Sequence, residues 1–396
     1  MYSPVSILDT DLYKLTMQQA IVQLYPNEYV TYKFINRGLT KFTFGLAELI
    51  RRRINMFAGL ALTKQEKLFL KDSCYYLSPA YLDFLEGYRF DPNEVIIDWA
   101  NNNLEIEISG PWYRTILWEV PLMALISETY YEHSKIETEW DFSKRAKYVR
   151  QKASALAKLN CKYSEFGTRR RYSLSNQEEV ITTIIQSEHK KNLLGTSNPY
   201  LAMKHNLKVL GTQAHEWYMF HGAKYGYRMA NHIGMEKWVD VYQGNLGIDL
   251  TDTYTTSVFF RDFGTKYSKL YDGLRHDSGD PRKFIDKAIY HYNQQHIDPN
   301  QKILMFSDSL NLKDIKLIKK WLELHHYTGP DRYGIGTWLT NDLKGVTPLN
   351  MVIKLSGVFV NNEWVPAVKL SDVSGKNTGE SEEVQLCKQT LRIKGE

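Results

Sequence analysis

A histidine that follows a glycine-containing loop is the first candidate for chemistry in this chain of 396 residues. An apolar run that begins at Leu207 ends in Gly211 and Thr212, and His215 then opens a segment with helical character. The junction of a strand with a helix offers free backbone N–H groups that suit phosphate, and imidazole can act as a base or a nucleophile near neutral pH. A lone histidine at such a position is often a core or helix-capping residue. Whether His215 is instead a catalytic residue depends on the other loops of the sequence.

Two further loops have the composition of phosphate-binding segments, one at residues 273–281 and one at residues 333–337. In the first loop, Arg275 is suited to bind a carboxylate or a phosphate. Asp277 is suited to orient ribose hydroxyls, Mg²⁺ or the imidazole of His215. A structural ion pair is the alternative interpretation of Arg275.

The loop at residues 333–337 contains two glycines. Gly334 and Gly336 have no side chain, so the backbone can approach a ligand closely, and Thr337 adds a hydroxyl donor. The loop does not match the dinucleotide-binding fingerprint, because Leu339 stands at its third glycine position.

The composition is that of an ordinary globular protein with a mild positive charge. Hydrophobic residues make up 43% of the chain, and the net charge of +5 suits a small anionic substrate but not nucleic acid. The three cysteines are far apart, which favours a reducing compartment. We expect a cytoplasmic protein, because the sequence shows neither a secretion signal nor an apolar stretch of membrane-spanning length. The basic run 51–53 is expected to be a solvated helix face.

Beyond about residue 130, short aliphatic runs alternate with polar loops and amphipathic helices, as in parallel α/β proteins. Asn198-Pro199 and Asp280-Pro281 predict helix starts, and Ser175 with Glu178 matches a capping box. The motif loops follow strands, so they would meet at the carboxyl ends of a barrel or of an open sheet. Periodicity alone leaves both open.

The flanking segments have a different pattern. A helix is predicted over residues 12–24, and the alternation at residues 104–108 predicts an antiparallel strand. Residues 351–355 and 365–370 also have the composition of strands.

Seven segments, taken in order, resemble the nicotinate phosphoribosyltransferase family: residues 9–18, 165–171, 195–198, 211–216, 275–280, 306–309 and 334–337. The resemblance extends from about residue 9 to about residue 379. It implies an irregular α/β barrel over residues 131–349 and an N-terminal mixed α+β domain over residues 1–130, completed by residues 350–396.

The resemblance also implies a reaction. Phosphoribosyl would pass from 5-phosphoribosyl 1-diphosphate to nicotinate in NAD salvage, with Mg²⁺ stabilising the diphosphate. ATP would be the co-substrate that phosphorylates His215. His215 and Asp277 would be the catalytic residues, and the metal ligands are not assigned.

Substrate-binding roles follow from the matched motifs. Phe166 would stack on the pyridine ring, and Arg169 would be the inward-facing arginine of the run 169–171. Arg275 would contact the substrate, Asp308 would lie in the ribose and phosphate region, and Thr212 would belong to a phosphate loop. The 5′-phosphate cradle would consist of Gly334, Gly336 and Thr337.

The family pattern further implies a homodimer with shared active sites, in which Tyr13 reaches the pyridine slot of the other chain. A core tyrosine on the helix 12–24 is the alternative interpretation of Tyr13. Nicotinamide-using relatives carry an acidic residue where this chain has Ser197, so the neutral hydroxyl favours nicotinate over nicotinamide.

Two other classes of protein are alternatives. A phosphate-binding barrel lyase or isomerase would need a catalytic lysine or carboxylate at a strand end, and no such lysine lies in a motif loop. An RNA-binding protein would need exposed aromatic residues among lysines and arginines, which the 27 tyrosines leave open. We expect no nucleic-acid partner and no membrane partner.

Overall fold

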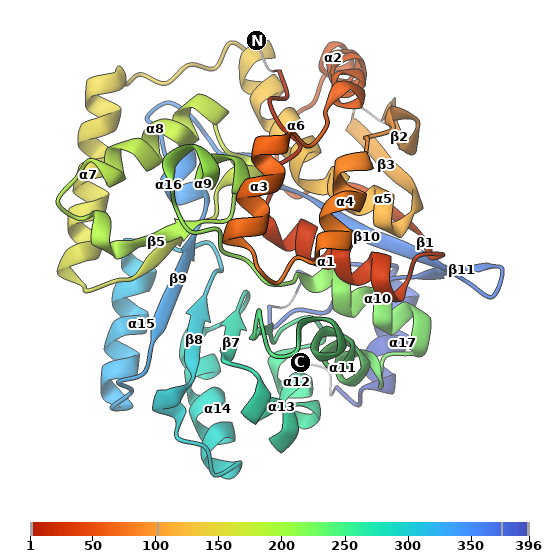
Figure 1. Cartoon of the computed structure of the whole chain (residues 1–396), viewed down its shortest axis with the longest axis vertical. Coiled ribbons are helices and arrows are strands. Elements are labelled where there is room, and N and C mark those ends of the chain that lie inside the picture. The colour runs from red at the N-terminus through yellow and green to blue at the C-terminus, as the bar shows by residue number, and fades with distance from the viewer. Residues whose placement is uncertain (1–2, 101–102, 374, 394–396) are drawn as a thin grey trace.

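The computed structural model describes residues 3–100, 103–373 and 375–393 and contains two sheets (Figure 1). One sheet is parallel and has the order β5-β4-β9-β8-β7-β6. Its strands are β4 (Tyr163–Glu165), β5 (Leu193–Thr196), β6 (Ile248–Leu250), β7 (Gly273–His276), β8 (Ile303–Phe306) and β9 (Asp331–Ile335).

The segment at residues 208–212 bridges the two edges of the parallel sheet. Thr196 on β5 pairs in parallel with Val209, and the Thr212 hydroxyl donates to the carbonyl oxygen of Ile248 on β6 at 3.0 Å. A Cβ on Gly195 would lie 2.1 Å from the carbonyl oxygen of Lys208, so the close approach requires glycine. The sheet is therefore an irregular barrel, as predicted.

Helices cover the outside of this barrel, and the loops that connect them to the strands lie at its rim. They are α7 (Phe142–Lys158), α8 (Leu174–Ile185), α9 (Pro199–His205), α10 (His215–Tyr225), α11 (Ala230–Tyr242), α12 (Thr256–Asp262), α13 (Thr265–Leu270), α14 (Pro281–Gln294), α15 (Leu312–Leu324) and α16 (Thr337–Thr340).

The observed first residues of the helices test the helix starts that were predicted from local sequence. Asn198 caps α9 before Pro199, and Asp280 caps α14 before Pro281, as predicted. The predicted capping box at Ser175 is wrong. The hydroxyl of Ser173 accepts from the backbone N–H of Asn176, so α8 begins earlier and Ser175 lies in its first turn.

The second sheet is antiparallel, with the order β11-β10-β1-β3-β2. Its strands are β1 (Tyr29–Asn36), β2 (Val95–Ala100), β3 (Asn103–Pro111), β10 (Met351–Val360) and β11 (Glu363–Pro366). The helices that accompany it are α1 (Leu12–Leu24), α2 (Phe44–Ile54), α3 (Lys64–Ser73), α4 (Pro79–Gly87), α5 (Trp112–Thr115), α6 (Glu119–His133) and α17 (Ser381–Thr390).

The C-terminal segment joins the N-terminal sheet. Strand β10 pairs antiparallel with β1, from Val30 opposite Val358 to Asn36 opposite Met351. The fold class, an α/β barrel with an N-terminal α+β part completed by the C-terminal segment, is thereby confirmed. The domain limits at residues 130 and 350 stay a prediction.

Two smaller predictions fail. The strand predicted over residues 365–370 ends at Pro366, and Lys369 takes part in an isolated bridge with Thr378 instead. Arg53 does not face solvent, because it is buried and donates to Thr129 and pairs with Glu132, each at 2.9 Å. No helix in the described part of the chain is long and apolar enough to cross a membrane.

Candidate active site

A cavity of about 330 Å³ lies at the carboxyl ends of the parallel strands, beside the start of α10. Most of the predicted site residues line it: Tyr13, Phe166, Arg169, Ser197, His215, Arg275, Asp277, Gly334, Gly336 and Thr337. The barrel thus brings together segments that are far apart in the sequence.

Two predicted residues are not among those that line the cavity. The Thr212 hydroxyl donates to Ile248, and its carbonyl oxygen accepts from Thr16 at 2.6 Å, so this residue links α1 and β6. Asp308 lies 3.8 Å from the ammonium group of Lys376, and its burial raises the pKa of the carboxyl group. Its neighbours Ser307 and Ser309 line the cavity instead.

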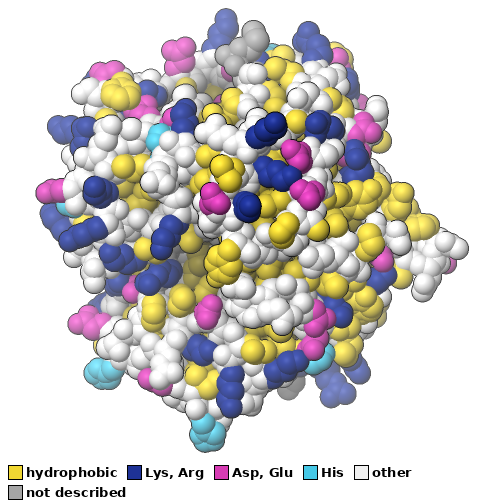
Figure 2. Space-filling view, viewed as in Figure 1, with side chains coloured by type: hydrophobic (Ala, Val, Ile, Leu, Met, Phe, Trp, Pro, Cys, Tyr) yellow, Lys and Arg dark blue, Asp and Glu magenta, His cyan; other side chains and the backbone are white. Residues whose placement is uncertain are grey.

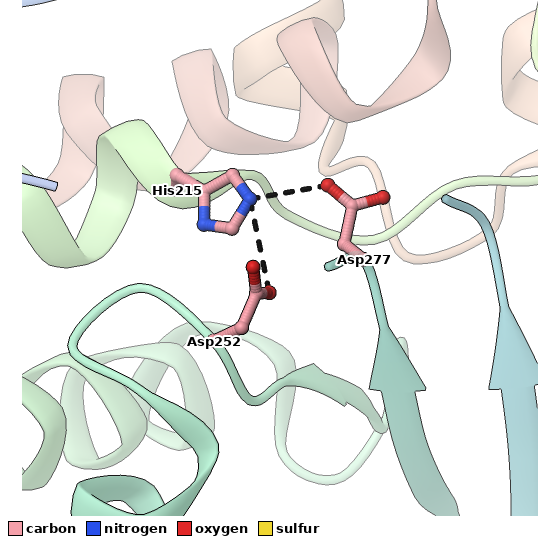
Figure 3. Close-up of side chains that lie close together, drawn as sticks. All are labelled: His215, Asp252 and Asp277. Atoms are coloured by element: carbon pink, nitrogen blue, oxygen red, sulfur yellow. Dashed lines mark hydrogen bonds and ion pairs between the residues drawn. The ribbon is translucent and has the colours of Figure 1, made fainter. Parts of the chain in front are cut away.

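His215 is the first residue of α10 and is only 4% exposed. Its Nδ1 lies 3.0 Å from Thr253 Oγ1, and its Nε2 lies 3.1 Å from Asp277 Oδ2 and 3.8 Å from Asp252 Oδ1 (Figure 3). Burial, and then the positive charge of Lys369, lower the pKa of His215 to about 4. The imidazole is therefore neutral at physiological pH, with the Nε2 proton donated to the carboxylate and a lone pair on Nδ1.

Asp277 stays ionised beside this imidazole. Burial would raise the pKa of its carboxyl group, but the hydrogen bond with His215 and the charges of Arg275 and Lys369 hold the pKa below its usual range. Ser307 donates a second hydrogen bond to Oδ1 at 2.6 Å. Asp277 can thus fix the tautomer of His215, one of the roles predicted for it.

Asp252 is a site residue that the sequence analysis missed. It is fully buried, and its Oδ2 accepts from Ser278 at 2.6 Å and lies 3.3 Å from Lys369 Nζ. No residue that the structure describes donates a hydrogen bond to its other oxygen, Oδ1. His215, Asp252 and Asp277 each present a ligand atom within 4.8 Å of the others, so they could hold a metal ion. An aspartate just after a strand is the sequence signal that could have identified Asp252. The strand before it has only three residues, too few to show the alternation that predicts a strand.

Arg275 presents a nearly buried guanidinium group to the cavity. Its Nη2 donates to the carbonyl oxygen of Gln213 at 2.8 Å. Its Nε has no acceptor among the residues described. A buried, incompletely paired cation at a cavity wall is suited to bind an anionic ligand.

Strand β9 supports the aromatic ring of Phe166, which is predicted to stack on the pyridine ring of the substrate. A Cβ on Gly334 would lie 2.5 Å from the ring of Phe166, so the ring packs directly on β9. The ring thus occupies one side of Gly334, which also lines the cavity, and the close approach of a ligand to this glycine stays a prediction. Gly336 is similar, since its Cβ would lie 3.0 Å from the carbonyl oxygen of Phe166.

Tyr13 belongs to the cavity of its own chain. It is 9% exposed on α1, and the guanidinium carbon of Arg169 lies 5.9 Å from its ring centroid. The preceding residue, Leu12, donates from its backbone to Ser197 at 2.7 Å, which holds α1 against the barrel of the same chain. Tyr13 thus lines the cavity of its own chain, and its reach into the pyridine slot of a partner stays a prediction.

The three consecutive arginines separate into two groups. Arg169 and Arg170 line the cavity, and burial, followed by the charge of Arg169, lowers the pKa of Arg170 to about 10. Arg171 is fully buried and bonds both carboxylate oxygens of Asp9 at 2.7 Å, so it is not a surface or interface residue. Arg169 thus faces the site as predicted.

Glu216 follows His215 in the sequence but binds a different set of partners. It accepts from Trp112 at 2.7 Å and from Tyr32, and it lies 2.6 Å from Lys14 Nζ. Lys14 also lies 2.6 Å from Glu119, which in turn lies 3.6 Å from Arg169. This buried set, which we call the Lys14 network, connects the start of α10 with the arginine of the cavity.

Comparisons with known proteins agree with this arrangement. Residues 161–394 match the model of the nicotinate phosphoribosyltransferase (NAPRTase) family, and residues 8–127 match that of its N-terminal domain. The chain is 49% identical over 391 residues to the nicotinate phosphoribosyltransferase of Desulforapulum autotrophicum and 46% identical over 389 residues to that of Chromohalobacter salexigens, with 98% of each chain covered.

Solved structures give the same result. The crystal structure of nicotinate phosphoribosyltransferase from Porphyromonas gingivalis superposes with a TM-score of 0.94 at 45% identity, covering 99% of this chain and 100% of that one. The enzyme of that name from Vibrio cholerae gives a TM-score of 0.91 at 32% identity, covering 99% of this chain and 94% of that one.

Proposed function

Because the chain belongs to the nicotinate phosphoribosyltransferase family, we propose that it makes nicotinate mononucleotide and diphosphate from nicotinate and 5-phosphoribosyl 1-diphosphate, in NAD salvage. We further propose that ATP drives the reaction by phosphorylating His215. One observation carries the proposal: a buried neutral imidazole, at the start of a helix, opens onto the same cavity as Arg275 and the aromatic residues Tyr13 and Phe166.

Nicotinate is a flat ring with one carboxylate, and the cavity offers complementary groups. Phe166 and Tyr13 supply aromatic faces, and base stacking on such faces contributes on the order of 1 kcal/mol each. Arg169 and Arg275 supply cations for the carboxylate and the phosphates. Ser197 donates to Asp11 at 2.6 Å and leaves no acidic side chain at the position of the nicotinamide-specific residue.

The phosphoryl step uses the nitrogen of His215 that carries no proton. Its lone pair attacks the γ-phosphorus of ATP, so that an N–P bond forms as the bond to the bridging oxygen breaks and ADP leaves. Asp277 holds the other ring nitrogen and stabilises the positive charge that develops on the imidazole. Later hydrolysis of the phosphohistidine would couple ATP energy to formation of the product.

Mg²⁺ is the expected metal, and two carboxylates of the site fit it. Asp252 Oδ1 is buried without a described donor, and Asp277 is ionised, so both offer oxygen ligands of the kind that Mg²⁺ prefers. When bound, the ion would neutralise negative charge on the diphosphate as the bond to C1′ breaks. The side chains of Arg169 and Arg275 would share that charge from the other walls.

We also propose that the protein is a cytoplasmic homodimer. Hydrophobic side chains gather on the side of the molecule formed by β1, β10 and β11 (Figure 2). Tyr29, Phe359 and Trp364 on these strands are 49%, 37% and 50% exposed, which suits a subunit contact. Mass measurement in solution tests the oligomeric state, and a monomer at all concentrations would remove this part of the proposal.

The reaction is tested with purified protein, nicotinate, 5-phosphoribosyl 1-diphosphate and Mg²⁺, with and without ATP. Nicotinate mononucleotide should form faster with ATP, and intact mass at alkaline pH should show one phosphoryl group that His215→Ala lacks. Slow transfer without ATP should persist in that variant. Equal turnover of nicotinamide and nicotinate would instead favour the alternative, a nicotinamide phosphoribosyltransferase.

A further inference from the structure

A second cavity, of about 780 Å³, lies on the other side of the loop that carries Lys369 to Asp372. Helices α12 and α14 form one wall, and α17 with the residues after it forms the other. Five basic side chains line it, and we call it the basic groove: Arg261, Lys283, Lys287, Lys388 and Arg392.

These five cations have no carboxylate partner within ion-pair distance in the described ranges of the chain. Arg261 donates to the carbonyl oxygen of Leu391 at 2.8 Å, and Lys287 donates to the hydroxyl of Ser257 at 2.7 Å. Such neutral contacts orient the two side chains but do not neutralise them. Like charges in one cavity repel, and an anionic ligand would remove that repulsion.

The acidic residues at the groove are already used by the fold. Asp280 caps α14 and pairs with Arg282 at 2.7 Å. Asp372 accepts from the backbone N–H of Thr256 at 2.9 Å and from its hydroxyl group. Neither carboxylate pairs with a lysine or arginine of the groove, so the cavity keeps an excess of positive charge.

The remaining lining is partly apolar: Val258, Phe284, Leu370, Val373, Leu391 and Ile393. A cavity of this volume is within the range of small-molecule sites, about 300–1,000 Å³. Apolar side chains next to several unpaired cations match a ligand with one flat apolar part and one multiply charged part. We propose that the basic groove binds the polyphosphate of a nucleoside triphosphate, with the base against the apolar side chains, at a site separate from His215.

The basic groove and the His215 site are separated only by the loop that carries Lys369 to Asp372. The variants that test the groove must therefore lie outside this loop. Ser371 donates to Ser278, which donates to Asp252 at the His215 site. Changes in this loop would disturb both cavities. Lys283, Lys287 and Arg392 lie outside it, are exposed, and can be changed without touching the residues around His215.

The test is calorimetric titration of the full-length protein with ATP, inorganic triphosphate and adenosine. Relative to wild type, the variant Lys283→Gln/Lys287→Gln/Arg392→Gln should lose one binding site per chain for triphosphate, or bind it at least about tenfold more weakly there. The control removes the same charge from exposed lysines of α15, by Lys313→Gln/Lys316→Gln/Lys320→Gln, and should bind as wild type does.

ATP should bind the groove more tightly than triphosphate, and adenosine should not bind measurably. Unchanged triphosphate binding in the groove variant would overturn the proposal, as would tighter binding of single-stranded RNA than of ATP in wild type. Phosphorylation of His215 should be the same in the groove variant and in wild type. Failure of the transferase assay would therefore leave the calorimetric result unaffected, so the two proposals fail separately.

Discussion

Replacing Lys14 with methionine tests the reasoning about the Lys14 network. Its ammonium group is fully buried and lies 2.6 Å from one carboxylate oxygen of Glu119 and 2.6 Å from one of Glu216. Lys14→Met keeps much of the side-chain volume but leaves two buried carboxylates without their shared cation. Breaking a buried pair by removing one partner costs about 3–5 kcal/mol.

That loss is large compared with a total free energy of unfolding of about 5–15 kcal/mol. The measurement is urea unfolding at pH 8, with the exposed Lys33→Met on the neighbouring strand β1 as the control. The control should stay within about 0.5 kcal/mol of wild type. A loss in Lys14→Met no greater than that of the control would refute the claim that the network stabilises the fold.

The pH dependence gives a second, independent check. Burial would raise the pKa of Glu119, but Lys14, and then Lys354 and Arg169, hold it at about 2 in the wild type. Without Lys14 the pKa should rise, so the folded variant binds protons more readily and its deficit should shrink as the pH falls from 8 to 5. A deficit that does not change with pH would show that unpaired charge is not its cause.

Four further outcomes are expected. Gly334→Ala should displace the Phe166 ring, whose nearest atom lies 2.5 Å from the new Cβ, and should raise KM for nicotinate more than KM for the phosphoribosyl donor. Because the pKa of His215 is about 4, the rate of phosphoryl-adduct formation should stay level from pH 8 to about 5 and fall as the pH approaches 4; an apparent pKa near 6.5 would contradict this. Arg275→Ala should weaken transition-state binding by about 2–5 kcal/mol, measured as kcat/KM for nicotinate, and an unchanged value would exclude its contact with substrate. Asp252→Asn should raise the Mg²⁺ concentration needed for half-maximal activity, whereas an unchanged requirement would remove Asp252 as a metal ligand.

The sequence by itself determined the features that depend on neighbouring residues. Asn198-Pro199 and Asp280-Pro281 start helices because a side-chain cap and a proline act within one turn. The helix Leu12–Leu24 was predicted with its observed limits. Ordered motifs identified the family, and most of the site residues predicted from them line one cavity because parallel strands place their carboxyl ends together.

Only the tertiary structure decided which side chain meets which. Nothing local distinguishes Arg169, which faces the cavity, from Arg171, whose partner Asp9 lies far away in the sequence. Glu216 follows His215, yet its partner is Lys14, because consecutive residues at the start of a helix point in different directions. Asp252 follows the three-residue strand β6, whose place is set by its pairing with β7 and by the hydrogen bond from Thr212 to Ile248. Such contacts join segments more than a hundred residues apart or adjacent strands, and packing rather than local sequence selects them.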